Sequence, residues 1–590
     1  MTAESPLHTI ATAILETLAD AGVSFLFANF GSDHPAFIEA LAAARGTGRT
    51  VPAVITCPNE MVAMSAAHGA ALVTGHAEAV LVHVDCGTQA LAGAVHNAAR
   101  GHVSVLIFAG LSPFTQEGEL RGSRNEFIHW LQHVPDQRGI VRGYVKYENE
   151  IRSGRNAGQI IRRALQFAES DPKGPVYLTV AREVLEEEIP RGSHDIGGFP
   201  RIAPGAIAEA EFKALVADLL AAKRPLIVTS HLGRNPEAVG ALAKLARRLA
   251  IGVVESVPSA MNFPADDPSY LGVQWSESRQ NKALAEADVV LVIESDVPWI
   301  PVANRPHPKV RIYHIDVDPL KERLPLWHIP AHAVFRADAA GALGQINHRL
   351  AKVPEDEARI SDRRLSLRRR HEEYARSLLE RERLSAAEVT PEFAIASLRP
   401  HLDAQTIILN EAITSYPLVI KHLGARPGGS VFASGGGSLG WHGDAAIGVG
   451  LACPEKTVVA VAGDGSYLFS EPATVHWMAR QYRTPFLTLV LNSRDLAGAE
   501  ALHPRPSPFR LRKPCQRSGR LLRSPTRLCR HCRGRRRCLC RHGSQAGENG
   551  SGARARVPCR ARGAPCRCGR CLAAAALSRC RLRTRARGAA

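Results

Sequence analysis

Short runs of Val, Ile and Leu recur along the first 500 residues, and Ala-rich stretches and Gly-containing loops separate them. Six of these runs are AVLVHVD (79–85), SVLIFAG (104–110), RPLIVTS (224–230), DVVLVIESD (288–296), TIILNE (406–411) and FLTLVLNS (486–493). Strands that are buried on both faces read as continuous apolar runs of this length. Strands that alternate with helices form parallel sheets through right-handed crossovers. This alternation of strand-like and helix-like segments predicts an α/β protein of doubly wound parallel sheets.

Composition shifts predict where the chain divides, because 590 residues exceed what one hydrophobic core supports. Gly and Pro are dense in residues 190–205, and residues 355–384 are rich in charges of both signs. Mixed charges favour a solvated linker helix over a binding surface. We expect a first domain over 1–190, a central domain over 200–352, a linker helix over 353–384, a third domain over 385–493 and a separate tail over 494–590.

The net charge of +18 comes from the C-terminal part of the chain. Residues 501–590 hold 25 of the 74 Lys and Arg residues but only one of the 56 acidic residues, which leaves 49 basic and 55 acidic residues in 1–500. A mildly acidic body gives no reason to expect a nucleic-acid partner. Ten of the 13 cysteines also lie beyond residue 500, and the others, Cys57, Cys86 and Cys453, are too widely spaced for a disulfide framework. Without a signal-peptide pattern or a long apolar run, the chain is expected to be cytoplasmic, with no membrane contact.

The segment VVAVAGDGSYLFS (458–470) reads as a buried strand that ends in Gly-Asp-Gly-Ser. Glycines beside Asp464 let the backbone approach a ligand, and ligands of α/β sheets bind at the carboxyl ends of strands. Alone, the segment could equally be an ordinary tight turn. However, 26 residues (466–491) separate it from Asn492, which ends the next strand, so a crossover would bring Asp464 and Asn492 together. Two hard oxygen ligands beside a diphosphate suit Mg²⁺.

These features resemble the thiamine-diphosphate-dependent enzymes of the acetolactate synthase and benzoylformate decarboxylase group. Gly-Asp-Gly followed by Asn at this spacing is the signature of that family, SGGGSLGWHGDAAIGVGLACPEKTVVAVAGDGS (434–466) is similar to its cofactor domain, and NEAITS (410–415) to its diphosphate-side loop. The resemblance extends from residue 1 to about residue 493. It implies pyrimidine-binding, central Rossmann-like and diphosphate-binding domains, thiamine diphosphate and Mg²⁺ as cofactors, and a small 2-keto acid as substrate. It also implies a homodimer or homotetramer, with each active site between the first domain of one chain and the third domain of another.

The resemblance implies roles for matching residues of the third domain. Asp464, Asn492 and the backbone carbonyl of Arg494 are expected to bind Mg²⁺. Leu439 is expected to lie under the thiazolium ring and impose a bent cofactor conformation, while also serving as a core residue. The full set of expected cofactor contacts is Asn410, Glu411, Thr414, Ser415, Ser438, Leu439, Gly463, Gly465 and Ser466.

Three residues of the first domain are expected to complete the site. Glu60 opens an Ala-rich helix in CPNEMVAMSAAHGAALVTG (57–75). An acid is common at that position for dipole reasons alone, but the family places there a Glu that hydrogen-bonds the aminopyrimidine ring and makes its amino group a base. Ser32 and His83 match an active-site Ser and His of benzoylformate decarboxylase. A His at the end of a strand could equally be a satisfied core residue.

The expected activity is non-oxidative decarboxylation or carboligation of a 2-keto acid, as in acetolactate synthases. Those enzymes carry a Gln after the strand that corresponds to SVLIFAG, whereas this chain reads LSPFT (111–115), so a benzoylformate-decarboxylase-like lyase is the alternative. Some relatives bind flavin or a nucleotide in the central domain. No convincing G-x-G-x-x-G is present here, so FAD is possible but not supported, and the central domain is expected to be structural.

Arg and Cys dominate the tail, where the resemblance stops although the cofactor domain of the family continues. CRHCRGRRRCLC and CRARGAPCRCGRC lack the regular Cys pairs of a zinc module, and ten cysteines are unusual for a nucleic-acid-binding arm. With GC-rich synonymous codons chosen for Arg494–Ser507, reading one base later can give GTWRAPKRSTLALH, which is similar to the segment after the Asn in this family. We predict that residues from about Arg494 onward are out of frame, through a sequencing error or a real frameshift, and disordered. The competing class is a non-catalytic protein, either a cofactor-incompetent remnant or a basic-tailed binding protein.

Overall fold

The computed structural model describes residues 7–190, 197–275, 279–383, 389–493, 560–561 and 564–565. By its internal contacts the chain divides into residues 1–505 and 506–590, and all three large sheets lie in the first unit. In the second unit the described residues form a short antiparallel pairing of β19 (Arg560–Ala561) with β20 (Ala564–Pro565). Arg494 and the predicted disorder of the tail lie outside the described residues.

The first sheet has six parallel strands in the order β3-β2-β4-β5-β7-β6. Its central strands are buried along their whole length, because helices cover both faces. The strands are β2 (Phe25–Ala28), β3 (Ala53–Thr56), β4 (Glu78–Val82), β5 (Val105–Leu111), β6 (Glu148–Ile151) and β7 (Val176–Ala181). The helices are α1 (Ile10–Asp20), α2 (Pro35–Thr47), α3 (Glu60–Thr74), α4 (Val84–Arg100), α5 (Ile128–Leu131), α6 (Ala157–Glu169) and α7 (Arg182–Leu185). A short antiparallel pair, β1 (Leu7–Thr9) and β8 (Glu188–Pro190), joins the two ends of this region.

The central sheet is also six-stranded and parallel, in the order β11-β10-β9-β12-β13-β14. The strand order reverses between β9 and β12, which creates a topological switch point. The strands are β9 (Pro225–Thr229), β10 (Gly252–Ser256), β11 (Tyr270–Gln274), β12 (Val289–Ile293), β13 (Arg311–Asp316) and β14 (Ala333–Arg336). The helices are α8 (Glu209–Ala221), α9 (Pro236–Leu249), α10 (Lys282–Glu286) and α11 (Ala339–Leu350).

The third sheet contains four parallel strands in the order β16-β15-β17-β18. The strands are β15 (Thr406–Glu411), β16 (Val431–Phe432), β17 (Thr457–Gly463) and β18 (Phe486–Leu491). The helices are α13 (Pro391–Leu398), α14 (Tyr416–His422), α15 (His442–Ala452), α16 (Asp464–Phe469) and α17 (Pro472–Tyr482). Within the expected linker, α12 (Glu357–Arg381) is one long helix that buries only Ile360 and Arg363. The predicted α/β class with parallel sheets is therefore confirmed.

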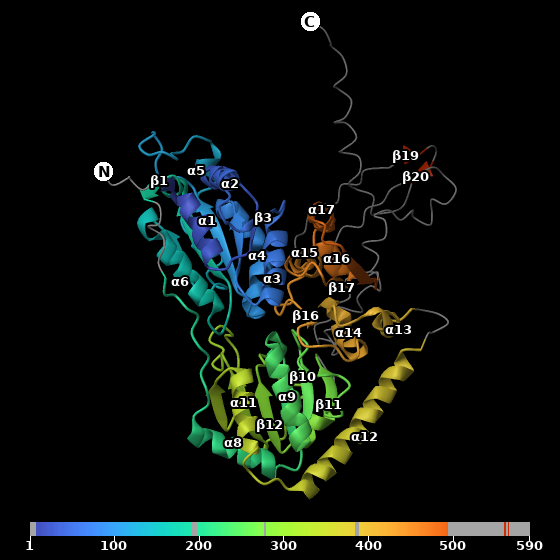
Figure 1. Cartoon of the computed structure of the whole chain (residues 1–590). Coiled ribbons are helices and arrows are strands. Elements are labelled where there is room, and N and C mark those ends of the chain that lie inside the picture. Colours follow the sequence, from blue (N-terminus) through green and yellow to red (C-terminus); the bar gives the residue numbers. More distant parts are fainter. Residues whose placement is uncertain are drawn as a thin grey trace, which may run out of the picture. The chain divides into compact units, whose positions relative to one another are not determined.

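Helix α3 packs closely on α15 and so joins the first and third domains of one chain (Figure 1). The contact depends on small residues, because a Cβ on Gly448 would clash with the carbonyl oxygen of Ala66 and one on Gly69 with that of Ala445. Ala66, Ala67 and their neighbours in α3 are fully buried. The Ala-rich composition of this helix thus permits close approach of two backbones.

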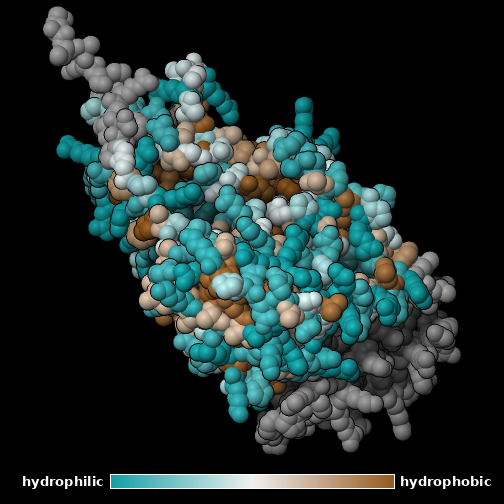
Figure 2. All heavy atoms as spheres, turned by 60° about the horizontal axis from the view of Figure 1, so that its bottom comes forward, coloured by the Kyte–Doolittle hydropathy of each residue, from teal (hydrophilic) through white to brown (hydrophobic). Residues whose placement is uncertain are grey.

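The face of the molecule seen in Figure 2 is mainly hydrophilic, with small apolar patches. Across the part of the chain that the structure describes, no helix is both long and apolar enough to cross a membrane.

Candidate active site

Three strands of the third sheet end at one edge. In the register of this sheet Glu411 pairs with Ala462, and Gly463 pairs with Leu491. Asp464 and Asn492 each follow one member of the second pair, so they start from neighbouring positions, as their spacing predicts. The hydroxyl of Ser493 donates a hydrogen bond to Asp464 Oδ1 at 3.3 Å.

The same edge has room and donors for a phosphate group. A Cβ built on Gly463 meets no atom within 4 Å. Thr414 and Ser415 lie in the short helix η5 (Ile413–Ser415) that follows β15, and Ser466 is tied to that strand because its Oγ donates to the Glu411 carbonyl at 3.0 Å. Side-chain hydroxyls, an uncrowded backbone at Gly463 and hard oxygen ligands suit a diphosphate with Mg²⁺.

A metal ion at this edge would depend on more than acidic side chains. Across the described residues no group of three or more His, Cys, Asp or Glu could hold a metal ion. Asp464 would therefore act with an amide oxygen, phosphate and water, which is the kind of coordination that Mg²⁺ accepts.

Asn410 and Glu411 are buried, and their polar atoms contact the protein itself. Glu411 accepts hydrogen bonds from the backbone N–H of Gly440 at 2.6 Å and from the backbone N–H and ring Nδ1 of His442 at 2.8 and 2.6 Å. Asn410 accepts from the Ala412 N–H at 3.2 Å. These contacts brace the loops that carry the other expected cofactor residues, and direct contact of either side chain with a cofactor stays a prediction.

The Gly-rich turn before α15 meets the first domain at the start of α3. Asn97 of α4 hydrogen-bonds the backbone N–H and carbonyl of Ser438, both at 2.9 Å. Gly440 has a φ of 98°, and a Cβ on it would lie 3.2 Å from the methyl group of Met61. Half-buried Leu439 therefore lies next to the junction where Glu60 opens α3.

The first sheet brings Ser32, Glu60 and His83 to one edge. Ala28 at the end of β2 pairs with Thr56 of β3 and Leu81 of β4, so the segments that carry all three residues leave the sheet side by side.

Glu60 is half-buried and held by one oxygen. Asn29 Nδ2 donates to Glu60 Oε1 at 3.0 Å, and no described residue donates to Oε2. A Cβ on Gly87 would lie 3.2 Å from Oε1, so glycine preserves the space beside this carboxylate. Asn59 caps α3 by accepting the Val62 N–H at 3.2 Å, which fixes the start of the helix. The arrangement leaves one carboxyl oxygen for a ligand.

His83 differs from the sequence expectation in its local structure, because β4 ends at Val82 and His83 is the N-cap of α4. Its Nδ1 lies 2.5 Å from Asp33 Oδ1 and its Nε2 lies 2.7 Å from Gln132 Oε1. Val84 adopts a φ of 30°, rare for a β-branched residue, while its N–H donates to Asp33 Oδ2 at 3.3 Å. Such strain persists only where surrounding contacts impose it, and it is common at functional sites.

The Asp33 carboxyl is 1 % exposed. Burial acts to raise its pKa, but the charges of His34 and His83 and the hydrogen bond from His83 outweigh burial, so the pKa is lowered. Burial likewise acts to lower the pKa of His83, and the hydrogen bond and charge of Asp33 overcome it, so this pKa is raised. The two groups stabilise each other in their charged forms.

Ser32 Oγ lies 3.3 Å from Nε2 of His129, a buried residue of α5. Ser32 therefore has a partner within its own domain. Sequence reasoning missed His129, Asp33, Asn29, Gln132 and Asn97. Asp33 could have been suspected because it adjoins Ser32 in the same loop, whereas nothing local marks Gln132 or Asn97.

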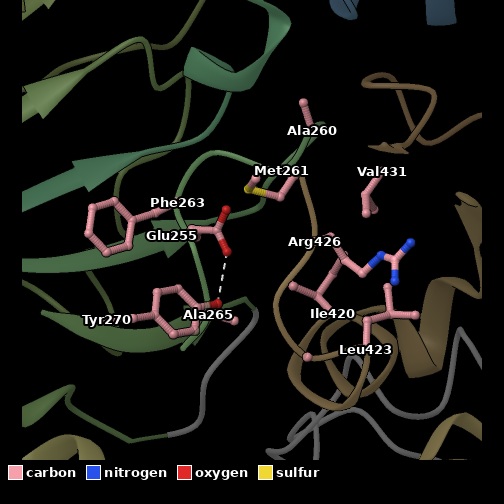
Figure 3. A pocket seen from close by; sticks show the side chains of 11 residues that line it. Glu255, Ala260, Met261, Phe263, Ala265, Tyr270, Ile420, Leu423, Arg426 and Val431 are labelled. Carbon is pink, nitrogen blue, oxygen red and sulfur yellow. Dashed lines mark hydrogen bonds between the residues drawn. The ribbon is translucent and has the colours of Figure 1, made fainter. Parts of the chain in front are cut away.

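A separate pocket lies between the central and third sheets (Figure 3). Its carboxylate, Glu255, is satisfied from within: Tyr270 donates at 2.8 Å and the side chain of Asn262 at 2.9 Å. Arg426 lies across the pocket and donates to the carbonyl of Leu402 at 3.1 Å. None of the predicted site residues lines this pocket, so it is distinct from the candidate active site.

The chain has three parallel-sheet domains, an acid at the start of α3, and an Asp and an Asn at one edge of the third sheet. This arrangement fits a class of α/β enzymes that use a diphosphate cofactor. The sequence matches the N-terminal TPP-binding domain of thiamine pyrophosphate enzymes over residues 8–140, the central domain over 212–339 and the C-terminal TPP-binding domain over 412–504. The chain belongs to the thiamine pyrophosphate enzyme family.

Characterised relatives share about a quarter of the residues. The chain is 24% identical to benzoylformate decarboxylase of Pseudomonas aeruginosa, with 82% of this chain and 86% of the relative covered. It is 24% identical to the acetolactate synthase large subunit of Haemophilus influenzae, with 82% of each covered. It is 25% identical to a probable 2-ketoarginine decarboxylase of Pseudomonas aeruginosa, with 83% and 82% covered.

The fold also matches solved structures. A thiamine diphosphate-dependent 4-hydroxybenzoylformate decarboxylase from Rhodococcus jostii RHA1 superimposes with a TM-score of 0.67 at 21% identity, covering 85% of this chain and 90% of that chain. A putative thiamin diphosphate-dependent enzyme from Mycobacterium smegmatis gives a TM-score of 0.65 at 22% identity, covering 83% and 89%.

Proposed function

We propose that this chain is a thiamine diphosphate and Mg²⁺ dependent lyase that decarboxylates a 2-keto acid without oxidation and protonates the product. The observation that carries the proposal is His83, held between Asp33 and Gln132 at the sheet edge that also bears Glu60. A lyase must return a proton after carbon dioxide leaves, and an imidazole suits that task near neutral pH. The segment LSPFT (111–115), which stands where acetolactate synthases carry a Gln, gives no support to carboligation.

Thiamine diphosphate, when bound, supplies the carbon nucleophile and the electron sink for decarboxylation. Glu60 would share a proton with the pyrimidine ring through Oε2, while Asn29 holds Oε1. Asp464 and Asn492 would hold Mg²⁺, with the carbonyl of Arg494 as a further ligand.

Third-domain residues would position the cofactor. Thr414, Ser415 and the backbone from Gly463 to Ser466 would hold the diphosphate, and Leu439 would support the thiazolium ring. Within one chain the start of α3 already meets the turn that carries Leu439. We nevertheless expect a homodimer or homotetramer, as the family resemblance implies.

Purified protein supplied with thiamine diphosphate and Mg²⁺ should release carbon dioxide from a 2-keto acid and form the matching aldehyde. A panel of pyruvate, benzoylformate, 4-hydroxybenzoylformate and 2-ketoarginine covers the chemistry named for the relatives. Acetolactate as the main product from pyruvate would instead establish the synthase alternative. Absence of cofactor binding by calorimetry would establish the cofactor-incompetent alternative.

A further inference from the structure

The Asp33 carboxylate has an unusual charge balance. Among the described residues its ion-pair contacts are His83 and His34 alone, with no Lys or Arg. A carboxylate that is 1 % exposed needs a compensating charge, because burying an unpaired ion costs several kcal/mol or more. One of the two histidines must therefore carry that charge.

His34 is the neutral member of the pair. The backbone N–H of Gly31 donates to His34 Nδ1 at 3.0 Å, so Nδ1 is an acceptor and the single ring proton resides on Nε2. That Nε2 lies 3.2 Å from Asp33 Oδ2, close but not aligned for a hydrogen bond. Burial holds the pKa of His34 below its ordinary value. His83 is left as the cation.

The orientation of Gln132 agrees with a proton on His83 Nε2. Gln132 presents Oε1 to that nitrogen at 2.7 Å, and an amide oxygen can only accept. Gln132 therefore faces His83 as a hydrogen-bond acceptor.

We propose that Asp33 and Gln132 are positioning residues that hold His83 as a doubly protonated imidazolium, with both N–H groups directed at oxygen acceptors. Asp33 Oδ1 accepts from Nδ1, and Gln132 Oε1 accepts from Nε2. In the protein without substrate, Gln132 Oε1 lies where an oxygen of the substrate would accept from Nε2. This last step rests on the proposed function: a carboxylate or keto oxygen of the 2-keto acid takes the Nε2 proton contact over from Gln132.

Other charged groups around the ring do not alter the assignment. Asp85 in the first turn of α4 also favours the cation. His129 of α5 has its pKa lowered by burial and by Arg182, so it adds no competing positive charge at neutral pH. The titratable groups that act on His83 itself are Asp33, His34 and Asp85. Farther out, Glu60 and Asp85 act on Cys86, and Asp33 acts on His129.

An NMR titration of protein labelled with ¹³C at histidine Cε1 tests the assignment without substrate. The His83 signal is identified by its loss in His83→Asn. Asp33→Asn and Gln132→Leu should each move the His83 titration to lower pH, Asp33→Asn by more because it removes a charge. Gln132→Glu, which keeps an oxygen acceptor, should leave the titration at or above its position in the wild type. Gln116→Leu, the same change at an exposed position between β5 and α5, should leave it unmoved.

A titration that stays in place in both Asp33→Asn and Gln132→Leu would overturn the proposal, provided that circular dichroism shows folded protein. Enzyme activity is measured in a separate experiment. Asp33→Asn should lower kcat at pH 7.5 about 100-fold, with the basic limb of the pH profile moved to lower pH. An inactive wild type with the expected titrations would contradict the proposed function but leave the assignment of His83 standing.

Discussion

Asp444, in the first turn of α15, illustrates how one buried acid shapes pH dependence. It is 0 % exposed, and neither carboxyl oxygen has a hydrogen-bond partner among the described residues. Burial, helped by the charges of Glu411 and Glu471, raises its pKa well above the ordinary value. The folded protein therefore favours the protonated form.

The free energy of unfolding of Asp444→Asn should exceed that of the wild type by an amount that grows as pH rises. An acid with a raised pKa in the folded state binds its proton more tightly there than in the unfolded chain. The free energy of unfolding of the wild type therefore falls above the unfolded pKa of about 3.9, by about 1.4 kcal/mol per pH unit, until the folded pKa is reached. The Asp444→Asn variant does not lose this free energy, because an Asn side chain does not titrate. Calorimetric Tm values at pH 5 and pH 8 should show the gap widening, whereas exposed Asp362→Asn should show no change; a gap that does not grow would contradict this account.

Gly87→Ala tests whether the space beside Glu60 matters. The new methyl group would lie 3.2 Å from Glu60 Oε1 and 3.1 Å from Val82 Cβ, so the carboxylate must shift. A shift of this size in an activating group should lower kcat about tenfold or more, with little change in fold. Gly240→Ala is the matched control, since a Cβ there, in α9, meets nothing within 4 Å. Equal kcat in both variants would show that the position of Glu60 is not critical.

At the scale of helices and strands, the contact of α3 with α15 joins the two expected cofactor domains. Gly448→Ala forces a Cβ into the Ala66 carbonyl, and overpacking of this kind costs about 1–3 kcal/mol. Urea unfolding should show that loss. Gly344→Ala in α11, where a Cβ meets nothing within 4 Å, should be neutral or stabilising. Full stability of Gly448→Ala would mean that the two helices can separate without cost.

Strands were predictable from sequence because strands buried on both faces leave continuous apolar runs. All six named runs overlap a strand, and TIILNE coincides with β15. FLTLVLNS is the exception to the expected burial, because β18 lies at the edge of its sheet and Leu487 is 54 % exposed. The run AVLVHVD was placed less well, because β4 ends at Val82 and the chain turns into α4 at His83. There tertiary contacts with Asp33 decide the backbone, and no local pattern encodes them. The juxtaposition of Asp464 and Asn492 was predictable because parallel strands end at a common edge. Gln132 follows the short helix α5, and no such rule predicts its place.

At the scale of the whole molecule, the central domain indicates whether the protein can bind a nucleotide cofactor such as FAD. Asp296 follows β12, which borders the switch point, and Asp316 ends the neighbouring strand β13. Lys321, only 3 % exposed, lies 2.7 Å from an oxygen of Asp296 and 2.9 Å from an oxygen of Asp316. These ion pairs lie beside the switch point between β9 and β12, which is where doubly wound domains bind nucleotides.

We therefore expect the purified protein to contain no flavin. Its absorbance should lack bands near 370 and 450 nm, and added FAD should keep the fluorescence of the free molecule, because the charged groups beside the switch point are already paired with each other. Stoichiometric FAD retained through gel filtration would contradict this expectation.

The central claim, that Glu60 activates a bound thiamine diphosphate, is tested most directly by hydrogen–deuterium exchange at C2 of the cofactor. The protein should come from a gene sequenced across the codons for Leu489 to Glu500, because the predicted frame change begins there. With Mg²⁺ present, the wild type should accelerate exchange at least about 1,000-fold over free cofactor, and Glu60→Gln should lose most of that acceleration. Glu39→Gln, an exposed change in α2, should keep it. Equal exchange in the wild type and Glu60→Gln, with the cofactor bound to both, would contradict the account.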